Sequence, residues 1–296
     1  LNWLLGAIRA VSSGVLRDYF EVILSSLVRD VSHQDPSDLR IRRRREPLDD
    51  ADVIGQFRAS LVEQSGRVVR FWRCRGHSRH EFLPSHIAHG DSRDWETMTR
   101  LFIAPESIDL VLTSPPYATA LPYIDTDRLS LLVLDGLHAA ARRPLEEALI
   151  GSREIARSRR LALDEQIDGV ADDRLPASVV RLLRSIRSRM TSRDVGFRRR
   201  NMPALLLRFF EDMQAVLTNV QRSLRSGGSA LIVMGDNLTS DGEQAIPIPT
   251  IRLVRDIAQH VGLSHLETIS ITVTTENLAH VRNAIKDNGV IWLRKP

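Results

Sequence analysis

The stretch that decides the fold is residues 108–117, which read Ile-Asp-Leu-Val-Leu-Thr-Ser-Pro-Pro-Tyr. Its first five residues form a short, nearly all-apolar run, typical of a strand buried on both faces of a parallel sheet. The run ends at Thr113, because the two prolines after Ser114 cannot continue the hydrogen bonding of a strand. We therefore predict a buried parallel strand over 108–112 that stops in a rigid turn.

The turn Ser114-Pro115-Pro116-Tyr117 has two interpretations. In the first, the prolines only end the strand and Tyr117 covers its end. In the second, the turn binds a ligand, since open α/β sheets bind ligands at the carboxyl ends of their strands. Two consecutive prolines remove two backbone donors, so the turn presents acceptors, notably the Ser114 hydroxyl and the Pro115 carbonyl. The exocyclic amine of a nucleobase needs two such acceptors, and Tyr117 offers a flat face for stacking an extruded base.

Outward from this turn, helical and strand-like hydrophobic patterns alternate, which predicts the α/β fold class. We predict helices over 3–30 (two, meeting at 12–14), 49–63, 93–102, 127–142, 201–227 and 250–260. We predict further strands over 66–75, 85–89, 230–234, 266–274 and 289–293, the last two as an antiparallel pair.

The composition excludes several classes of protein. The chain has 296 residues, 43% of them hydrophobic and 26% charged, which is ordinary globular composition. No apolar run approaches the roughly 18 residues of a membrane span, so we expect no membrane partner. Cys74 is the only cysteine, which excludes a disulfide scaffold and favours a reducing cytoplasm. Four histidines lack a cysteine at ligand spacing, so we expect no metal; they are His77, His80, His86 and His89.

The charge pattern points to nucleic acid. The formal net charge is +4, the isoelectric point is about 9.8, and nearly all basic residues are arginine. Guanidinium groups bind phosphate bidentately, although the codon bias of a GC-rich genome would give the same skew. Two arginine runs are candidate contacts to double-stranded DNA, with plain solvation as the alternative. They are Arg42, Arg43, Arg44 and Arg45, and Arg198, Arg199 and Arg200.

Composition also suggests four segments. Residues 1–65 form a helical segment with an arginine-rich loop, and 66–142 form the α/β part that holds the proline turn. Residues 143–200 are a helical insertion and a candidate for target recognition. Residues 201–296 complete the sheet.

The pentapeptide Thr113-Ser114-Pro115-Pro116-Tyr117 resembles the catalytic motif of the S-adenosylmethionine-dependent DNA amino-methyltransferases. That motif is a strand followed by Ser, Asp or Asn, two prolines and an aromatic residue. The serine variant is similar to the cytosine-N4 enzymes, whereas the adenine-N6 enzymes more often carry Asp or Asn. The resemblance covers about residues 85–125 and 203–296. It implies a Rossmann-like methyltransferase sheet and S-adenosylmethionine as cofactor.

The resemblance also assigns roles to single residues. It implies that Ser114, Pro115, Pro116 and Tyr117 are catalytic: they would grip and stack a flipped base while its amine attacks the methyl group directly.

Further candidates lie on either side of this motif. Gly90 and Asp91 lie where the family places an acidic loop near the cofactor adenine, and Thr113 is the third candidate for cofactor binding. Asp236 and Asn237 end the strand over 230–234 and are candidates for contact with the substrate or the catalytic loop. A turn or helix cap is the alternative for both.

One family feature is missing from the sequence. The glycine-rich cofactor loop, Phe-x-Gly-x-Gly after the first strand, does not occur. The chain begins with Leu1 inside a helical pattern, so we expect its natural start, with that loop and the first strands, to lie upstream. Alternatively, a partner chain supplies the loop. The sequence thus predicts a DNA methyltransferase, cytosine-N4 before adenine-N6, of restriction–modification or orphan type, with a non-catalytic DNA-binding fragment or subunit as the alternative.

Overall fold

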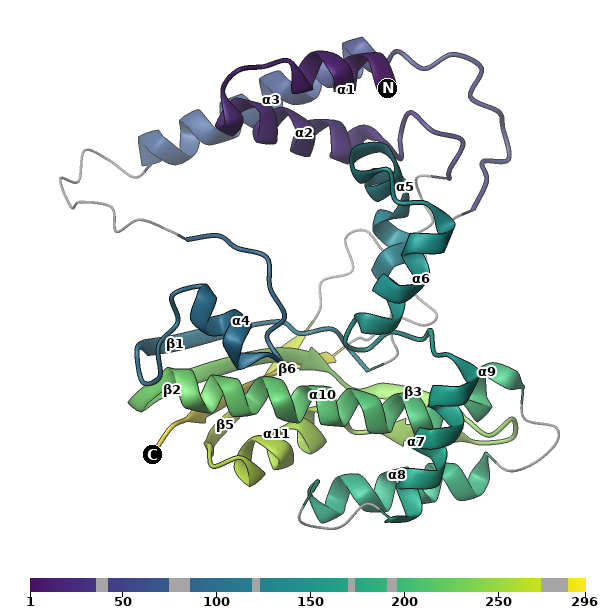
Figure 1. Ribbon diagram of the computed structural model, residues 1–296, viewed down its shortest axis with the longest axis vertical. Helices are drawn as coiled ribbons and strands as arrows, with labels where there is room; N and C mark the ends of the chain where they lie inside the picture. The colour runs from purple at the N-terminus through teal and green to yellow at the C-terminus, as the bar shows by residue number, and fades with distance from the viewer. Residues whose placement is uncertain (36–41, 75–85, 119–122, 170–173, 191–195, 273–286) are drawn as a thin grey trace. The chain divides into compact units, whose positions relative to one another are not determined.

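The computed structural model describes residues 1–35, 42–74, 86–118, 123–169, 174–190, 196–272 and 287–296 (Figure 1). They form two compact units. Unit 1 comprises Leu1–His86 and Pro122–Glu146, and unit 2 comprises Ile87–Leu121 and Glu147–Pro296. These units cut across the four predicted segments, because residues 122–146 belong with the N-terminal helices and 147–200 with the sheet.

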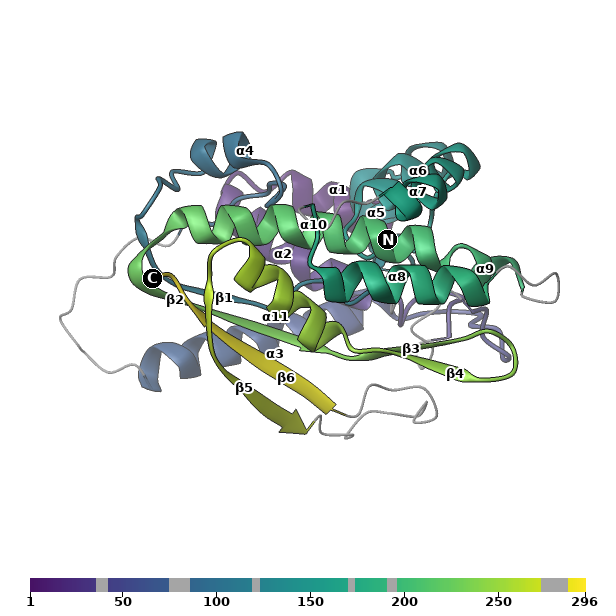
Figure 2. The same cartoon turned by 90° about the horizontal axis from the view of Figure 1, so that it is seen from below.

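Unit 2 is built on a four-stranded mixed sheet with the order β1-β2-β6-β5 (Figure 2). The strands are β1 (Ile108–Thr113), β2 (Leu224–Gly235), β6 (Asp287–Arg294) and β5 (Ser264–Thr272). Strands β1 and β2 are parallel, whereas β6 runs antiparallel to both β2 and β5. The α/β class and the antiparallel pairing of the last two strands are confirmed.

Helices α10 (Met202–Ser223) and α11 (Thr250–His260) pack on one face of this sheet (Figure 2). Apolar residues recur along α10 at helical spacing, so one side of the helix faces the core. The inward residues of β2, such as Ile232 and Met234, are buried in the same hydrophobic core as Phe210 of α10. This packing fixes the direction of β2 and, through it, of β1.

The expectation that β1 is buried on both faces is wrong. Val111 packs against the core, but Leu110 is 53% exposed and Leu112 is 69% exposed. The reason is the alternation of a strand: Leu110 and Leu112 point to the face opposite Val111, and the core of unit 2 packs on the face of Val111 only.

The described helices of the predicted insertion pack into the core of unit 2, and a role in target recognition stays a prediction. The insertion contains α7 (Arg157–Gly169), α8 (Ala177–Arg189) and the short α9 (Phe197–Arg200). Ile167 and Leu183 are fully buried in the core that also holds α10 and the sheet.

Two smaller elements complete unit 2. Helix α4 (Trp95–Arg100) begins at Asp94, whose carboxylate accepts hydrogen bonds from the backbone of Glu96 and Thr97. Strands β3 (Asn237–Ser240) and β4 (Ala245–Ile248) form a hairpin that we did not predict.

Unit 1 is helical throughout its regular elements. They are α1 (Asn2–Arg9), α2 (Gly14–Leu27), α3 (Val53–Cys74), α5 (Tyr123–Asp135) and α6 (Ala139–Ala148), the last of which runs into unit 2. The predicted break between the first two helices is confirmed, because the Ser13 hydroxyl caps α2 by accepting from Leu16 N. A small core with Ile8, Leu24 and Phe57 holds α1, α2 and α3 together.

Two predicted strands are wrong. Residues 66–74 are the second half of helix α3, in which Glu63 and Arg67 pair one turn apart at 2.6 Å. Ser65-Gly66 is a turn signal by residue type, yet the helix that begins at Val53 continues through it, because a single glycine is tolerated inside a helix. Residues 86–89 form no strand, and Ser85 lies outside the described residues.

The helices bear on the membrane question as well. None of those that the structure describes combines the length and apolar character that crossing a bilayer requires.

Candidate functional site

The SPPY loop (Ser114–Tyr117) leaves the carboxyl end of β1. Because β1 and β2 are parallel, with Thr113 opposite Ile232, both strands end at the same edge of the sheet. Ser114 is exposed, and its hydroxyl makes no hydrogen bond to any residue that the structure describes. Pro115, Pro116 and Tyr117 are half-buried. The loop therefore presents an available acceptor at the edge where α/β sheets bind ligands.

Asn237 anchors the far end of the SPPY loop. Its side-chain Nδ2 donates to the carbonyl oxygen of buried Ala118, while its Oδ1 accepts from Leu238 N at 2.8 Å. Asn237 thus contacts the candidate catalytic loop, and its contact with a substrate stays a prediction.

Asp236, its neighbour, caps a helix. Its Oδ1 accepts from Ile251 N, in the first turn of α11, at 2.9 Å. This is the alternative that the sequence left open for Asp236.

Gly151 lies close to the backbone of the SPPY loop. It has a φ of +73°, and a Cβ built on it would lie 2.8 Å from the Tyr117 carbonyl oxygen and 3.3 Å from Pro116 Cβ. The left-handed backbone and the close approach both require glycine at this position. We call the stretch around it, Ala148–Glu154, the 148–154 segment.

Arg208 holds the end of the 148–154 segment. It lies on α10, is 3% exposed, and donates from Nη1 to the Glu154 carbonyl at 3.1 Å and from Nη2 to the Ser152 carbonyl. Burial lowers the pKa of Arg208, yet a guanidinium keeps its proton in proteins. A buried cation therefore fixes this backbone.

The GD loop (Gly90–Arg93) holds two of the predicted cofactor-binding residues. Arg93 binds the Asp91 carboxylate with two nitrogens, Nη2 to Oδ2 at 2.7 Å and Nε to Oδ1 at 3.0 Å. This hydrogen bonding lowers the pKa of Asp91 from its ordinary value of 3.8. At Gly90, a Cβ would lie 2.5 Å from Thr97 Cγ2, so the loop is packed tightly on α4.

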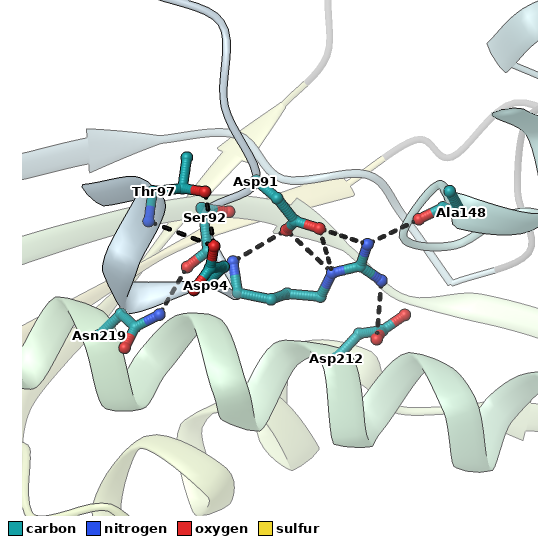
Figure 3. Close-up of polar contacts among 8 residues, drawn as sticks. Asp91, Ser92, Asp94, Thr97, Ala148, Asp212 and Asn219 are labelled. Carbon is teal, nitrogen blue, oxygen red and sulfur yellow. Dashed lines mark hydrogen bonds and ion pairs between the residues drawn. The ribbon is translucent and has the colours of Figure 1, made fainter. Parts of the chain in front are cut away.

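The same guanidinium ties the GD loop to α10 and to the 148–154 segment, as Figure 3 shows. Arg93 Nη1 donates to Asp212 Oδ1 at 2.9 Å, and Nη2 donates to the Ala148 carbonyl at 2.8 Å. Burial raises the pKa of Asp212, and the ion pair with Arg93 offsets this in part. Asn219 of α10 adds a hydrogen bond to the Ser92 carbonyl at 2.9 Å.

This network bears directly on the cofactor prediction. Both oxygens of Asp91 accept from Arg93, yet its side chain is 46% exposed and its carboxylate keeps further acceptor positions. Thr113 is half-buried at the end of β1. The cofactor roles of Gly90, Asp91 and Thr113 stay predictions.

The first arginine run has one internal member. Arg44 donates from Nε to the Ser32 carbonyl at 2.9 Å and from Nη2 to the Asp30 carbonyl, which joins two backbone segments of unit 1. Arg42, Arg43 and Arg45 are the other members of the run, and contact of these residues with DNA stays a prediction.

The second run lies in α9 of unit 2. Arg199 and Arg200 are exposed, while the side chain of Arg198 lies outside the described residues. Contact of this run with DNA also stays a prediction.

Sequence reasoning missed the residues that organise the site: Gly151, Arg93, Arg208 and Asp212. A signal was present for Arg208, which interrupts the apolar run Leu205-Leu206-Leu207-Arg208-Phe209-Phe210. A charge inside such a run indicates a buried, paired cation.

Comparison with known proteins assigns this chain to no family. No protein-family model matches the chain, and no curated protein matches it. Solved structures of TTHA0409 from Thermus thermophilus, provisionally described as a DNA modification methylase, do match. One shares 15% identity over 70% of this chain and 52% of that protein, with a TM-score of 0.33. A complex of the same protein with S-adenosyl-L-methionine shares 16% identity over 70% and 54%, with a TM-score of 0.34.

A selenomethionine derivative of that protein shares 22% identity over 30% of this chain and 37% of that one, with a TM-score of 0.25. The chain thus spans about half, or less, of the length of the protein it matches. Identities and TM-scores this low carry no argument about activity, and the α/β class rests on the strand order described above.

Proposed function

We propose that this chain carries the amine-binding side of a DNA amino-methyltransferase that uses S-adenosylmethionine and acts on cytosine N4. The observation that carries the proposal is the anchored SPPY loop, with its exposed Ser114, at the carboxyl end of a parallel strand. The Thr-Ser-Pro-Pro-Tyr sequence supports the assignment through its resemblance to the amino-methyltransferase motif. Adenine N6 is the alternative target.

The chemistry on the amine side follows from the loop. The Ser114 hydroxyl and the Pro115 carbonyl accept the two N–H groups of the exocyclic amine, which directs the nitrogen lone pair toward the methyl donor. As the nitrogen gains positive charge, the same two oxygens stabilise it until one of its protons leaves through the exposed Ser114 hydroxyl to solvent. Tyr117 stacks on the base that has left the duplex. No covalent intermediate with the protein is required.

The residues that the structure describes do not form a complete cofactor site. Asp91, the acidic candidate, is held by Arg93, and the glycine-rich loop does not occur in the sequence. We therefore derive no step through the methyl donor. A partner chain or an additional segment that carries this loop stays a prediction.

The pairing of Asp91 with Arg93 favours a second candidate function. A chain whose Asp91 serves only to hold its own loop would act as a non-catalytic DNA-binding subunit. In that case the exposed arginines Arg43, Arg45 and Arg199 would bind phosphates, and the SPPY loop would have no chemistry.

Calorimetry and methyl transfer separate the two functions. The chain is titrated with S-adenosylmethionine and then incubated with methyl-labelled cofactor and duplex DNA of mixed sequence. We expect label in N4-methylcytosine, loss of transfer in Ser114→Ala and Tyr117→Ala, and unchanged duplex affinity in both. Ser107→Ala, at an exposed turn before β1, is the matched control for Ser114→Ala.

Two results would contradict the enzyme assignment. One is the absence of cofactor affinity both alone and with a partner that carries the glycine-rich loop. The other is undiminished transfer in both loop variants. Label in N6-methyladenine would keep the loop chemistry and change the target base.

A further inference from the structure

Arg208 is a buried cation that the proposed chemistry does not use. A charged side chain that is 3% exposed destabilises the fold unless hydrogen bonds and an opposite charge compensate it. The carbonyls of Ser152 and Glu154 supply the hydrogen bonds, and Asp212, one turn along α10, supplies negative charge. An apolar side chain would fit this position of α10 without such compensation, so packing alone does not account for arginine here.

The two carbonyls belong to the 148–154 segment, which is held at both ends. Arg93 binds the Ala148 carbonyl at its start, at 2.8 Å, and Arg208 binds the carbonyls at its finish. Between these ends lies Gly151, on which a Cβ would meet the Tyr117 carbonyl and Pro116. Hydrogen bonds from Arg208 thus fix the segment to α10, and Gly151 brings it close to Pro116 and Tyr117 of the SPPY loop.

We propose that Arg208 is a positioning residue for the SPPY loop. By holding the 148–154 segment it fixes the backbone of Pro116 and Tyr117, and with it the directions of the Ser114 hydroxyl and the Pro115 carbonyl. A guanidinium suits this task because its planar fork binds two carbonyls at once, which an ammonium group cannot do in the same fixed geometry. The effect of Arg208 on catalysis rests on the proposed function. Its effect on the position of the SPPY loop, which we call the mechanical link, does not.

The first test is hydrogen–deuterium exchange on the full chain, which requires no activity. In Arg208→Met we expect faster exchange at the amides of Ser114, Tyr117 and Ala118, with unchanged exchange in α11 (Thr250–His260). Arg208→Lys keeps the charge but loses the planar fork, so its loop exchange should lie between that of the wild type and that of Arg208→Met. Arg225→Met is the control, since Arg225 is an exposed arginine that pairs with Asp109 at 2.7 Å.

The second test uses glycine and guards against a misfolded arginine variant. Gly151→Ala places a methyl group 2.8 Å from the Tyr117 carbonyl oxygen and should displace the loop. Gly227→Ala is its matched control. Gly227 has a φ of +75°, close to the +73° of Gly151, but nothing lies within 4 Å of its Cβ position. Only Gly151→Ala should speed exchange in the SPPY loop.

In methyl transfer, the positioning role predicts a split between kcat and KM. A catalytic group displaced by about 1 Å loses on the order of 100-fold in rate, so kcat should fall by about 100-fold in Arg208→Met and Gly151→Ala. Since neither residue contacts DNA or cofactor in the proposed mechanism, KM for both substrates should not change. Arg208→Lys should recover part of the lost kcat.

The outcomes separate this inference from the proposed function. Loop exchange equal to wild type in both Arg208→Met and Gly151→Ala would overturn it. So would a uniform rise throughout unit 2, which would make Arg208 a core residue only. A wild-type chain that transfers no methyl group, either alone or with a partner that carries the glycine-rich loop, while the loop exchange responds as expected, refutes the function and keeps the mechanical link. Full transfer in both variants refutes the inference alone.

Discussion

Helices α3 and α10 are both 22 residues long, yet they relate to their surroundings in opposite ways. In α10 thirteen residues are buried, whereas in α3 only Phe57 is. Consequently α10 positions a sheet and two loops, while the residues of α3 after Ser65 are exposed on every side. The difference shows that helix length carries little information about function. What matters is how many neighbours constrain the helix.

The largest expected effect is on core packing. Phe210 of α10 is fully buried, so Phe210→Ala should lower the free energy of unfolding by about 3–5 kcal/mol. Phe71 of α3 is 61% exposed and makes an edge contact with Trp72, so Phe71→Ala should lower it by about 1 kcal/mol or less. Urea unfolding of the full chain measures both. Equal losses would show that α3 is covered in solution and would contradict the difference in burial between the two helices.

Ion pairs should show the same difference on a smaller scale. Arg93→Met leaves the largely buried carboxylate of Asp212 without its cation and should destabilise the chain by about 2–3 kcal/mol. Arg67→Met in α3 removes an exposed pair with Glu63 and should change stability by about 0.3–0.5 kcal/mol. Adding salt to about 1 M should diminish the second effect far more than the first. Equal salt sensitivity would argue against a buried pair on α10.

Glycine in α3 offers a change of opposite sign. Gly66 lies inside the helix with nothing within 4 Å of its Cβ position, so Gly66→Ala should stabilise the chain by about 0.5–1 kcal/mol. Thermal unfolding followed by circular dichroism measures the gain. A loss instead would reveal an unseen contact on that side of α3.

The smallest expected effect is a pH dependence at the GD loop. The Asp91–Arg93 pair lowers the pKa of Asp91, so it stabilises the fold above the ordinary value of 3.8 and loses this effect as the pH falls through the lowered pKa. Asp91→Asn should therefore be less stable than wild type near neutral pH, by less than about 1 kcal/mol for this part-exposed pair. The difference should shrink as the pH falls below 3.8, and unfolding curves over this range measure it. A gap of constant size down to about pH 2 would contradict this assignment.

Much of unit 2 could be predicted from sequence, because burial leaves a periodic pattern. Helix α11 was predicted with its observed bounds, and β1, β2, β5 and β6 were each found within a few residues except at the long start of β2. The error at 66–74 arose where no burial selects a face. The residue types there favour a strand, namely Val68, Val69, Phe71 and Trp72. That preference reflects packing on a half-buried sheet, and these side chains are exposed, so the helix continues.

The site was predictable only where the chemistry is local. The Ser-Pro-Pro-Tyr turn consists of consecutive residues, whereas its supports come from positions 151, 208 and 237. Such contacts depend on tertiary placement, which no single-sequence pattern encodes. Asp91 illustrates the same limit, since its partner Arg93 is two residues away in the sequence but the second anchor, Asp212, is not local.

Helix α10 passes into strand β2 without a connecting loop, since Ser223 is the last helical residue and Leu224 the first of the strand. The final carbonyls of the helix, at Arg222 and Ser223, accept from the backbone of Glu106 and Ser107 just before β1. The junction thus has no loop residues that could absorb a change in chain length. Each residue inserted there would turn the helix by about 100° relative to the sheet or shift the strand register. Helix, strands and the loops they carry are consequently intolerant of any change in chain length at this one point.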